Sequence, residues 1–439
     1  MVLSLALSAC SLAPTYQRPD MAVPAGWSNV ADVGASAEAS DAPFWRELGS
    51  EELNRVMKVA LAQNLDLEAA LHRIAQARGQ ARVAGAPLYP ALEASGGSSR
   101  TIQDAGNTSA ARGIGSVNYE IDLWGKNRSN AAAANLRARA TEFDRDALRL
   151  IVSSDTAIFY TEVLSLNERI RIAENNLRNA EEVLRIIEAR YRAGAVSGLE
   201  LAQQRVAVNG FRAALSSLAE QRATTFNALA ILLGQAPQNS QAPKDTLASL
   251  KLPVVELTPP AVLLTARPDI ESAEAVLRAA NADIGAARAA FFPSLTLGVD
   301  TSIAAGFGGP AAAATSLANS VLAPIFTGGR LRGNLEAVTA RQKELAAQYR
   351  KTVLTAFQEV EDALAALKSS YEQSDISRQT VQESQNAYDI AKARFDAGAI
   401  DYLTLLETQR SLFQAQDDQI AIYGAQLQAF IQLRKALGG

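Results

Sequence analysis

The stretch Phe159–Leu201, FYTEVLSLNERIRIAENNLRNAEEVLRIIEARYRAGAVSGLEL, decides the fold. Its apolar residues advance by alternating steps of four and three: Phe159, Val163, Leu166, Ile170, Ala173, Leu177, Ala180, Leu184, Ile187 and Tyr191. This spacing is the heptad seam that packs knobs into holes in a coiled coil. Extended back to Arg128, a helix ending at Arg192 would be about 100 Å long at ~1.5 Å per residue. The sequence therefore predicts a rod longer than an ordinary domain.

The chain contains this plan twice. Four motif pairs recur in the same order at offsets of 202 to 204 residues: Asp66–Glu68 with Asp269–Glu271, Tyr89–Leu92 with Phe292–Leu295, Leu123–Arg128 with Ile325–Arg330, and Tyr191–Leu201 with Phe395–Leu405. The second half has its own seam, formed by Val353, Phe357, Val360, Leu364, Leu367 and Tyr371. Such duplication indicates a repeat architecture. Each half is expected to hold a helix, a β-hairpin, a very long helix, a tight glycine turn and a second helix.

Two proline-rich segments interrupt the helical pattern and divide the chain. We expect a signal peptide at 1–9, a lipidated N-terminal strap at 10–50, a first repeat at 51–233, a linker at 234–262 and a second repeat at 263–439. In the first repeat the expected elements are a hairpin at about 92–124, a long helix at about 126–193 and a helix at about 198–233. In the second they are about 294–326, 329–397 and 402–437. The strap and the linker are expected to pack around the middle of the helices.

Short segments between the helices alternate apolar and polar residues with period two. Four strands are predicted, at 92–102, 114–124, 294–304 and 314–326, with an external loop near 305–313. The pattern fits outer-membrane strands, apolar toward lipid and polar toward the lumen, and equally a half-buried soluble strand. Four strands cannot close a membrane barrel, and an open edge in lipid is forbidden. Eight strands leave a filled interior, so a transmembrane reading favours a trimer of twelve strands.

The N-terminus ends a short apolar run at Leu7-Ser8-Ala9-Cys10. Small residues before a Cys form the cleavage site of a bacterial lipoprotein signal, so Cys10 is predicted to carry acyl chains such as palmitate. The alternative is an incidental or buried Cys. The n-region lacks Lys and Arg and the apolar run is short, so we expect a signal peptide truncated at its start. Ser11 after the Cys fits sorting to the outer membrane of a Gram-negative cell.

Composition excludes most other classes of function. Lys plus Arg number 42 and Asp plus Glu 46, a net charge of −4, and nucleic-acid binders usually show a basic excess. One His, His72, and one Cys cannot form a zinc cluster, a disulfide framework or a Cys–His nucleophile pair. The sequence thus predicts no enzyme, no metal site and no nucleic-acid partner, and no cofactor beyond the lipid on Cys10.

Motifs along nearly the whole mature chain resemble the TolC-like outer membrane factors, in particular the OprM-like (NodT-type) efflux lipoproteins. They are Ala13–Pro19, Phe44-Trp45, Asn64–Leu67, Pro90-Ala91-Leu92, Tyr119–Gly125, Arg267–Ile270, Phe291–Leu295 and Ala356–Glu361. The resemblance implies a mainly α protein with a transmembrane β part, a homotrimer whose twelve-stranded barrel continues into a periplasmic α-helical coiled-coil barrel. It implies a lipid-anchored outer-membrane duct of a drug efflux pump, fed by a periplasmic adaptor and an inner-membrane proton-driven transporter.

The functional candidates lie at the far ends of the long helices, where glycine accepts the positive φ of a reversal. The tips are Gly194, Ala195, Val196 and Ser197, and Gly398, Ala399, Ile400 and Asp401. They could be passive connections; the resemblance makes them adaptor-docking sites. The resemblance also assigns Leu403 and Glu407, which share a helix face, to a gate at the closed periplasmic end. Two positions depart from the family: Glu407 replaces the usual Asp, and Phe395 replaces a Tyr that makes an inter-helix hydrogen bond.

Four alternatives remain beside the drug efflux duct. A type I protein-secretion duct or a heavy-metal efflux duct would share this fold. A periplasmic adaptor lipoprotein has one coiled-coil hairpin flanked by β-rich domains, rather than two repeats that each hold a β-hairpin. An enzyme on a helical scaffold is disfavoured because the chain has a single His and a single Cys.

Overall fold

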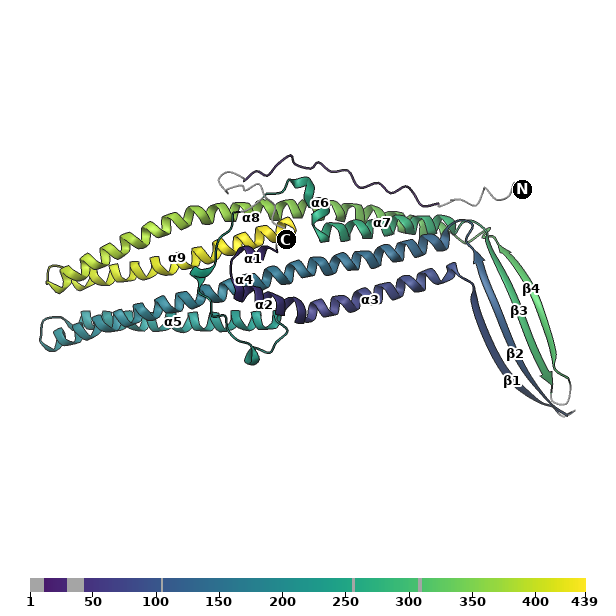
Figure 1. Ribbon diagram of the computed structural model, residues 1–439, viewed down its shortest axis with the longest axis horizontal. Coiled ribbons are helices and arrows are strands. Elements are labelled where there is room, and N and C mark those ends of the chain that lie inside the picture. The colour runs from purple at the N-terminus through teal and green to yellow at the C-terminus, as the bar shows by residue number, and fades with distance from the viewer. Residues whose placement is uncertain (1–11, 30–42, 104–105, 255–256, 307–309) are drawn as a thin grey trace. The chain divides into compact units, whose positions relative to one another are not determined.

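The computed structural model describes residues 12–29, 43–103, 106–254, 257–306 and 310–439 (Figure 1). Two compact units emerge from the contacts between residues. The strand unit holds the described residues of Met1–Ala22, Ala70–Arg145 and Pro268–Val353. The tip unit holds those of Val23–Ala69, Asp146–Arg267 and Leu354–Gly439. Each unit therefore combines parts of both sequence repeats. The expected signal peptide and Cys10 lie outside the described residues.

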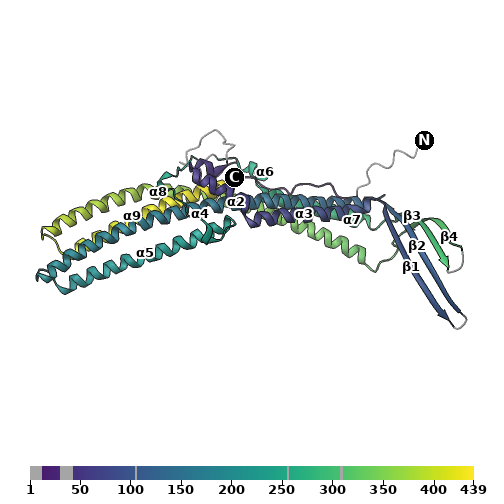
Figure 2. The same cartoon turned by 60° about the horizontal axis from the view of Figure 1, so that its bottom comes forward.

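The strand unit contains one antiparallel sheet of four strands in the order β1-β2-β3-β4 (Figure 2). The strands are β1 Ala91–Gln103, β2 Gly106–Ile121, β3 Ser294–Gly306 and β4 Ala312–Leu322. Paired residues share a face, so Val117 opposite Val299 lies on the apolar face and Ser116 opposite Asp300 on the polar face. The alternation predicted from the sequence is thus present across the sheet.

Strand β2 differs from its prediction. It starts at Gly106 rather than near 114 and ends at Ile121 rather than 124. The added residues contain Gly106 and Gly113 and alternate weakly, so their sequence carries little strand signal. They form a strand because β1 supplies hydrogen-bonding partners as far as Gln103 opposite Gly106. The last residues, Leu123 to Gly125, instead form the turn into the next helix.

Two helices precede the hairpins at equivalent positions of the repeats. They are α3 Leu65–Gly85 and α7 Pro268–Ala289. Asn64 caps α3, because its side-chain oxygen accepts hydrogen bonds from the backbone N–H groups of Asp66 and Leu67 at 3.0 and 3.1 Å. In α3 most side chains are exposed, whereas more than half of those in α7 are buried.

The two very long helices are α4 Lys126–Arg192 and α8 Arg330–Asp396, 67 residues each. At ~1.5 Å per residue each is about 100 Å long, as the heptad pattern predicts. The seam is largely buried; its most buried members are Val163, Leu166, Ala173, Ala180, Ile187, Val353, Val360, Leu364 and Leu367. The last member of each seam, Tyr191 or Tyr371, is exposed. Each long helix contributes residues to both units.

Helices α5 Gly198–Leu232 and α9 Tyr402–Leu437 follow the long helices and run back along them within the tip unit (Figure 1). The unit also has short elements: α1 Phe44–Glu47, α2 Glu51–Gln63, η2 Pro237–Asn239, η3 Leu247–Ser249, η4 Pro260–Val262 and α6 Leu263–Ala266. Gly438 caps the C-terminus of α9; its φ is 104° and its N–H bonds back to the last turn.

The linker and the strap residues that follow Ala22 contact helices of the tip unit. The linker is held by Glu52 of α2, whose carboxylate accepts the N–H groups of Lys244 and Asp245, each at 2.8 Å. The strap is held by Glu361 of α8, whose carboxylate accepts the N–H of Ser28 at 2.7 Å and the side-chain amide of Asn29 at 2.9 Å. Hydrogen bonds to charged carboxylates anchor chain that has no regular backbone pairing of its own.

Candidate functional site

The two tips of the tip unit have the same backbone geometry. Gly194 has φ 71° and Gly398 has φ 73°, the left-handed conformation that the sequence predicts for a reversal. At the first tip the N–H of Gly194 bonds the carbonyl of Tyr191 at 3.0 Å, and that of Ala195 bonds the carbonyl of Arg190 at 2.8 Å. The bonds of Gly398 and Ala399 at the second tip have the same spacing and lengths. Both long helices therefore end in a Schellman motif.

The helices that leave the tips begin with different caps. Ser197 and Glu200 form a reciprocal capping box at the start of α5, in which the N–H of Ser197 bonds the Glu200 carboxylate at 2.6 Å. Asp401 caps α9 by accepting the backbone N–H of Thr404 at 2.9 Å and its hydroxyl at 2.6 Å. These two hydrogen bonds hold the pKa of Asp401 below its usual value. The second tip thus carries an exposed carboxylate where the first carries a hydroxyl.

Side chains from both repeats form one apolar cluster behind the tips. Val196 and Ile400, the apolar residues of the tip turns, pack against it. Its buried members are Val183, Ile187, Leu201, Ala207, Tyr388, Ala391, Phe395, Tyr402, Leu405, Leu406 and Leu412. Because these residues come from α4, α5, α8 and α9, the cluster joins the two helical hairpins of one chain at this end (Figure 1).

A buried hydrogen-bond chain crosses this cluster. The hydroxyl of Tyr402 on α9 donates to the side-chain oxygen of Gln204 on α5, and the Gln204 amide donates to the carbonyl of Ala180 on α4 at 2.6 Å. Burial raises the pKa of Tyr402 well above its usual value, so the hydroxyl stays protonated as the donor. The sequence did not predict these two hydrogen bonds, because Tyr402 and Gln204 occupy positions where the two repeats differ.

Phe395 takes a different partner from the Tyr expected in the family. Its ring is buried, and the guanidinium of Arg190 lies over it, 4.5 Å from the ring centroid. Tyr402 contacts the same ring edge to face at 6.1 Å between centroids. A cation over an aromatic face is attracted without any hydroxyl. The equivalent first-repeat residue, Tyr191, is exposed.

The two gate candidates lie on the exposed face of α9, one turn apart. Leu403 is 48% exposed, unusual for a leucine whose neighbours Leu405 and Leu406 are buried. Glu407 is exposed as well. Their side chains therefore lie outside the apolar cluster and face away from the hairpin that carries them.

The single histidine, His72, is exposed on α3.

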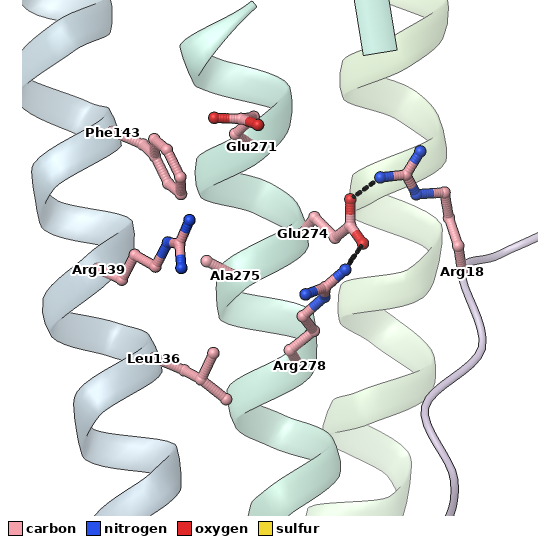
Figure 3. Close-up of a pocket in the computed structure, with 8 residues that line it drawn as sticks. All are labelled: Arg18, Leu136, Arg139, Phe143, Glu271, Glu274, Ala275 and Arg278. Carbon is pink, nitrogen blue, oxygen red and sulfur yellow. Dashed lines mark hydrogen bonds and ion pairs between the residues drawn. The ribbon is translucent and has the colours of Figure 1, made fainter. Parts of the chain in front are cut away.

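The strap forms a second site, in the strand unit, that sequence analysis missed. Glu274 of α7 is buried and receives the guanidinium groups of Arg18 from the strap and Arg278 from α7, at 2.5 and 2.7 Å (Figure 3). Burial by itself would raise the pKa of Glu274, but the hydrogen bonds and charges of the two arginines outweigh it and lower the pKa. The hydroxyl of Tyr16 also contacts Glu274, at 3.2 Å.

The strap stays close to α7 up to its first described residue. Asn281 donates to the carbonyl of Pro14 at 2.6 Å, and Arg288 donates to that of Leu12 at 3.2 Å. Between them lies Gly285, where an added Cβ would come within 2.7 Å of the Cβ of Ala13. The missing side chain therefore makes room for the strap. The first described contact of the strap with α7 is therefore at Leu12, two residues after Cys10 in the sequence.

The described residues, 12–29, 43–103, 106–254, 257–306 and 310–439, bear on membrane crossing and metal binding as well. No helix in those ranges is long and apolar enough to cross a membrane. Nor do three or more His, Cys, Asp or Glu side chains gather there in a group that could hold a metal ion.

Comparison with known proteins gives consistent matches over the whole chain. The family model described as outer membrane efflux protein matches residues 56–235 and again 260–439. The chain is 39% identical to the pyoverdine export outer membrane protein OpmQ of Pseudomonas aeruginosa, over 99% of this chain and 95% of that protein. It is 32% identical to the cation efflux system protein CusC of Escherichia coli, over 99% and 97%. A crystal structure of a membrane protein from Pseudomonas aeruginosa matches with TM-score 0.89 and 32% identity, over 98% of this chain and 100% of that one.

Proposed function

Because the chain belongs to the outer membrane efflux protein family, we propose that it is the outer-membrane exit duct of a tripartite RND-type efflux pump. The observation that carries this proposal is the match of both halves to the efflux family, together with a duplicated fold of long helices and antiparallel strands. A duct of this family is a passive channel and not an enzyme, and it needs no cofactor. The proposed organisation is a lipidated strap at 10–50, repeats at 51–233 and 263–439, and a linker at 234–262.

We propose further that the working form is a homotrimer. The sheet has one apolar and one polar face, and the residues of β4 are exposed along the whole strand. Unpaired backbone groups cannot face lipid, so the outer strands need partners. Three chains supply twelve strands, enough to enclose a lumen that continues into a barrel of the long helices.

The tips are the proposed docking sites for a periplasmic adaptor. An added Cβ at Gly194 or Gly398 would meet nothing within 4 Å, so the backbone at both turns is open to a partner. Small neighbours, Ala195 and Ala399, leave the turns accessible. The adaptor would connect this end to an inner-membrane proton-driven transporter.

Leu403 and Glu407 are the proposed periplasmic gate. In a trimer, three exposed Leu403 side chains facing one axis would form an apolar ring that disfavours water and ions. Three Glu407 carboxylates one turn away would repel one another and favour cations over anions. Such a closed state is held weakly, and adaptor docking could open it by biasing the helix ends apart.

Anchoring in the outer membrane is proposed to combine the strands with acyl chains on Cys10. The docked strap supports this placement, because it holds Leu12 beside Arg288 at the end of α7 that leads into β3. Two or more acyl chains anchor stably where one is marginal.

Small organic molecules are the proposed cargo, supported by the relative that exports pyoverdine. Metal cations are the second candidate, supported by the cation efflux relative. Deleting the gene and restoring it on a plasmid tests both. We expect the deletion to sensitise cells to organic toxic compounds, and the reconstituted protein to conduct ions. Sensitivity to metal cations alone would favour the second cargo. If the protein were instead a monodisperse monomer that stays soluble without detergent, the proposed duct would be refuted.

A further inference from the structure

An aromatic contact, or joint, in the strand unit forms in one place, and the matching residues of the other repeat remain exposed. At the exit of the first hairpin, Trp124 stacks on Phe292, with ring centroids 4.7 Å apart and planes 28° from parallel. Its indole N–H donates to the carbonyl of Pro293 at 2.8 Å. Phe292 and Pro293 lie at the entry of the second hairpin, so the joint locks the exit of β2 to the entry of β3.

The internal repeat contains the same parts a second time. Phe326 follows β4 as Trp124 follows β2, and Tyr89-Pro90 precede β1 as Phe292-Pro293 precede β3. Here the parts are separate: Phe326 is 91% exposed and Tyr89 is 73% exposed. They flank the two outer strands of the sheet, whose outer edges pair with no strand among the described residues (Figure 2).

We propose that Phe326 of one chain stacks on Tyr89 of the next, closing the same joint between two copies of this protein. The inference rests on the proposed trimer and adds its register. In the β2–β3 ladder, Ile121 pairs with Leu295, and continuing that ladder by three residues sets Trp124 opposite Phe292. The same rule sets Phe326 opposite Tyr89 and, further along the strands, Ser320 opposite Ser95.

The alternation of side chains supports this register independently. In it the apolar face of β4, with Leu317 and Val321, meets the face of β1 that carries Leu92 and Ala94. A slip of one residue would reverse every side chain and set Val321 beside Ser95. A slip of two residues keeps the faces but separates the two rings, so it loses the stack. The aromatic joint thus selects one of the registers that the faces allow.

Cysteine pairs test the register in the full chain. Residues directly opposite each other on neighbouring strands have Cβ atoms about 4.5–5.5 Å apart, within reach of a disulfide. Diagonal pairs lie too far apart to form one. We expect S95C/S320C to give disulfide-linked dimers and trimers under mild oxidation, several-fold more than S95C/A318C or S95C/L322C. Single variants S95C and S320C control for linkage through Cys10. Linkage through residue 318 or 322 instead would overturn the register and leave the trimer standing. No linkage in any pair of a membrane-inserted protein would overturn both.

Aromatic substitutions test the joint itself. We expect Y89A and F326A each to lower the temperature at which the trimer dissociates in detergent, and the double variant to lose little more than either one, because both remove the same contact. I325A is the matched control, since Ile325 is equally exposed and adjacent but lies outside the stack. Fully additive losses for Y89A and F326A would refute direct stacking.

Discussion

Replacing Gly285 with Ala tests how the strap is held on α7. In an exposed helix interior this change is favourable by up to about 1 kcal/mol, because Ala loses less conformational freedom than Gly. At Gly285, however, the new Cβ would lie 2.7 Å from the Cβ of Ala13 and 2.9 Å from its Cα and N. Carbon atoms prefer about 3.5–4.0 Å, and overpacking of this kind costs about 1–3 kcal/mol. We therefore expect net destabilisation.

Gly333 of α8 is the control, because an added Cβ there meets nothing within 4 Å. Thermal unfolding in detergent, followed by helical circular dichroism, should separate G285A from G333A by about 1–3 kcal/mol in the direction of lower stability. A13G should rescue G285A only in part, since it removes the atom at 2.7 Å but leaves the backbone atoms at 2.9 Å. Equal stability of G285A and G333A would refute close docking of the strap.

Four further outcomes follow from the sites. E274Q should destabilise the protein by about 1–3 kcal/mol at pH 7. Because the folded-state pKa of Glu274 is lowered, the stability it contributes is present above its unfolded pKa near 4.5 and is lost on acidification. The melting temperatures of parent and variant should therefore converge in acid, and a constant difference would contradict this. C10S should abolish fatty-acid labelling; persistent label would disprove acylation of Cys10. G398V should strain the positive φ and reduce drug resistance without dissolving the trimer, whereas full resistance would place docking elsewhere. L403A/E407A should raise single-channel conductance and weaken cation selectivity, and unchanged currents would exclude the gate.

Features with a local periodic signal were predictable from the sequence. The seam from Phe159 to Ile187 repeats every turn, so it predicts α4 without knowledge of its partners, and Gly194 marks the end by its tolerance of positive φ. The early part of β2, from Gly106, was not predicted, since its residues alternate weakly and gain strand structure only by pairing with β1. Tyr191 continues the seam by spacing yet is exposed, because the long helix ends one residue later.

Contacts between distant segments left no such signal. Arg18 reads as one charge in a proline-rich segment, and Glu274 as a solvated position on an amphipathic helix; only the fold brings them together. Gly285 reads as a weak point of a helix until Ala13 is seen beside it. The family resemblance was confirmed by the comparisons. Its motif Ala13–Pro19 contains Tyr16 and Arg18, but the motif alone did not show that both residues contact Glu274.

The docked strap also imposes an order of events during synthesis. Arg18 leaves the ribosome 256 residues before Glu274, its partner on α7. At about 5–20 residues per second, the strap waits roughly 10–50 seconds before its docking helix exists. During that interval residues 12–18 of the strap cannot contact α7, because the helix has not yet been synthesised. Once α7 folds, Asn281 binds the carbonyl of Pro14 and Arg288 binds that of Leu12. The synthesis of the strap and its docking are thus separated in time by the distance along the chain between the strap and its helix.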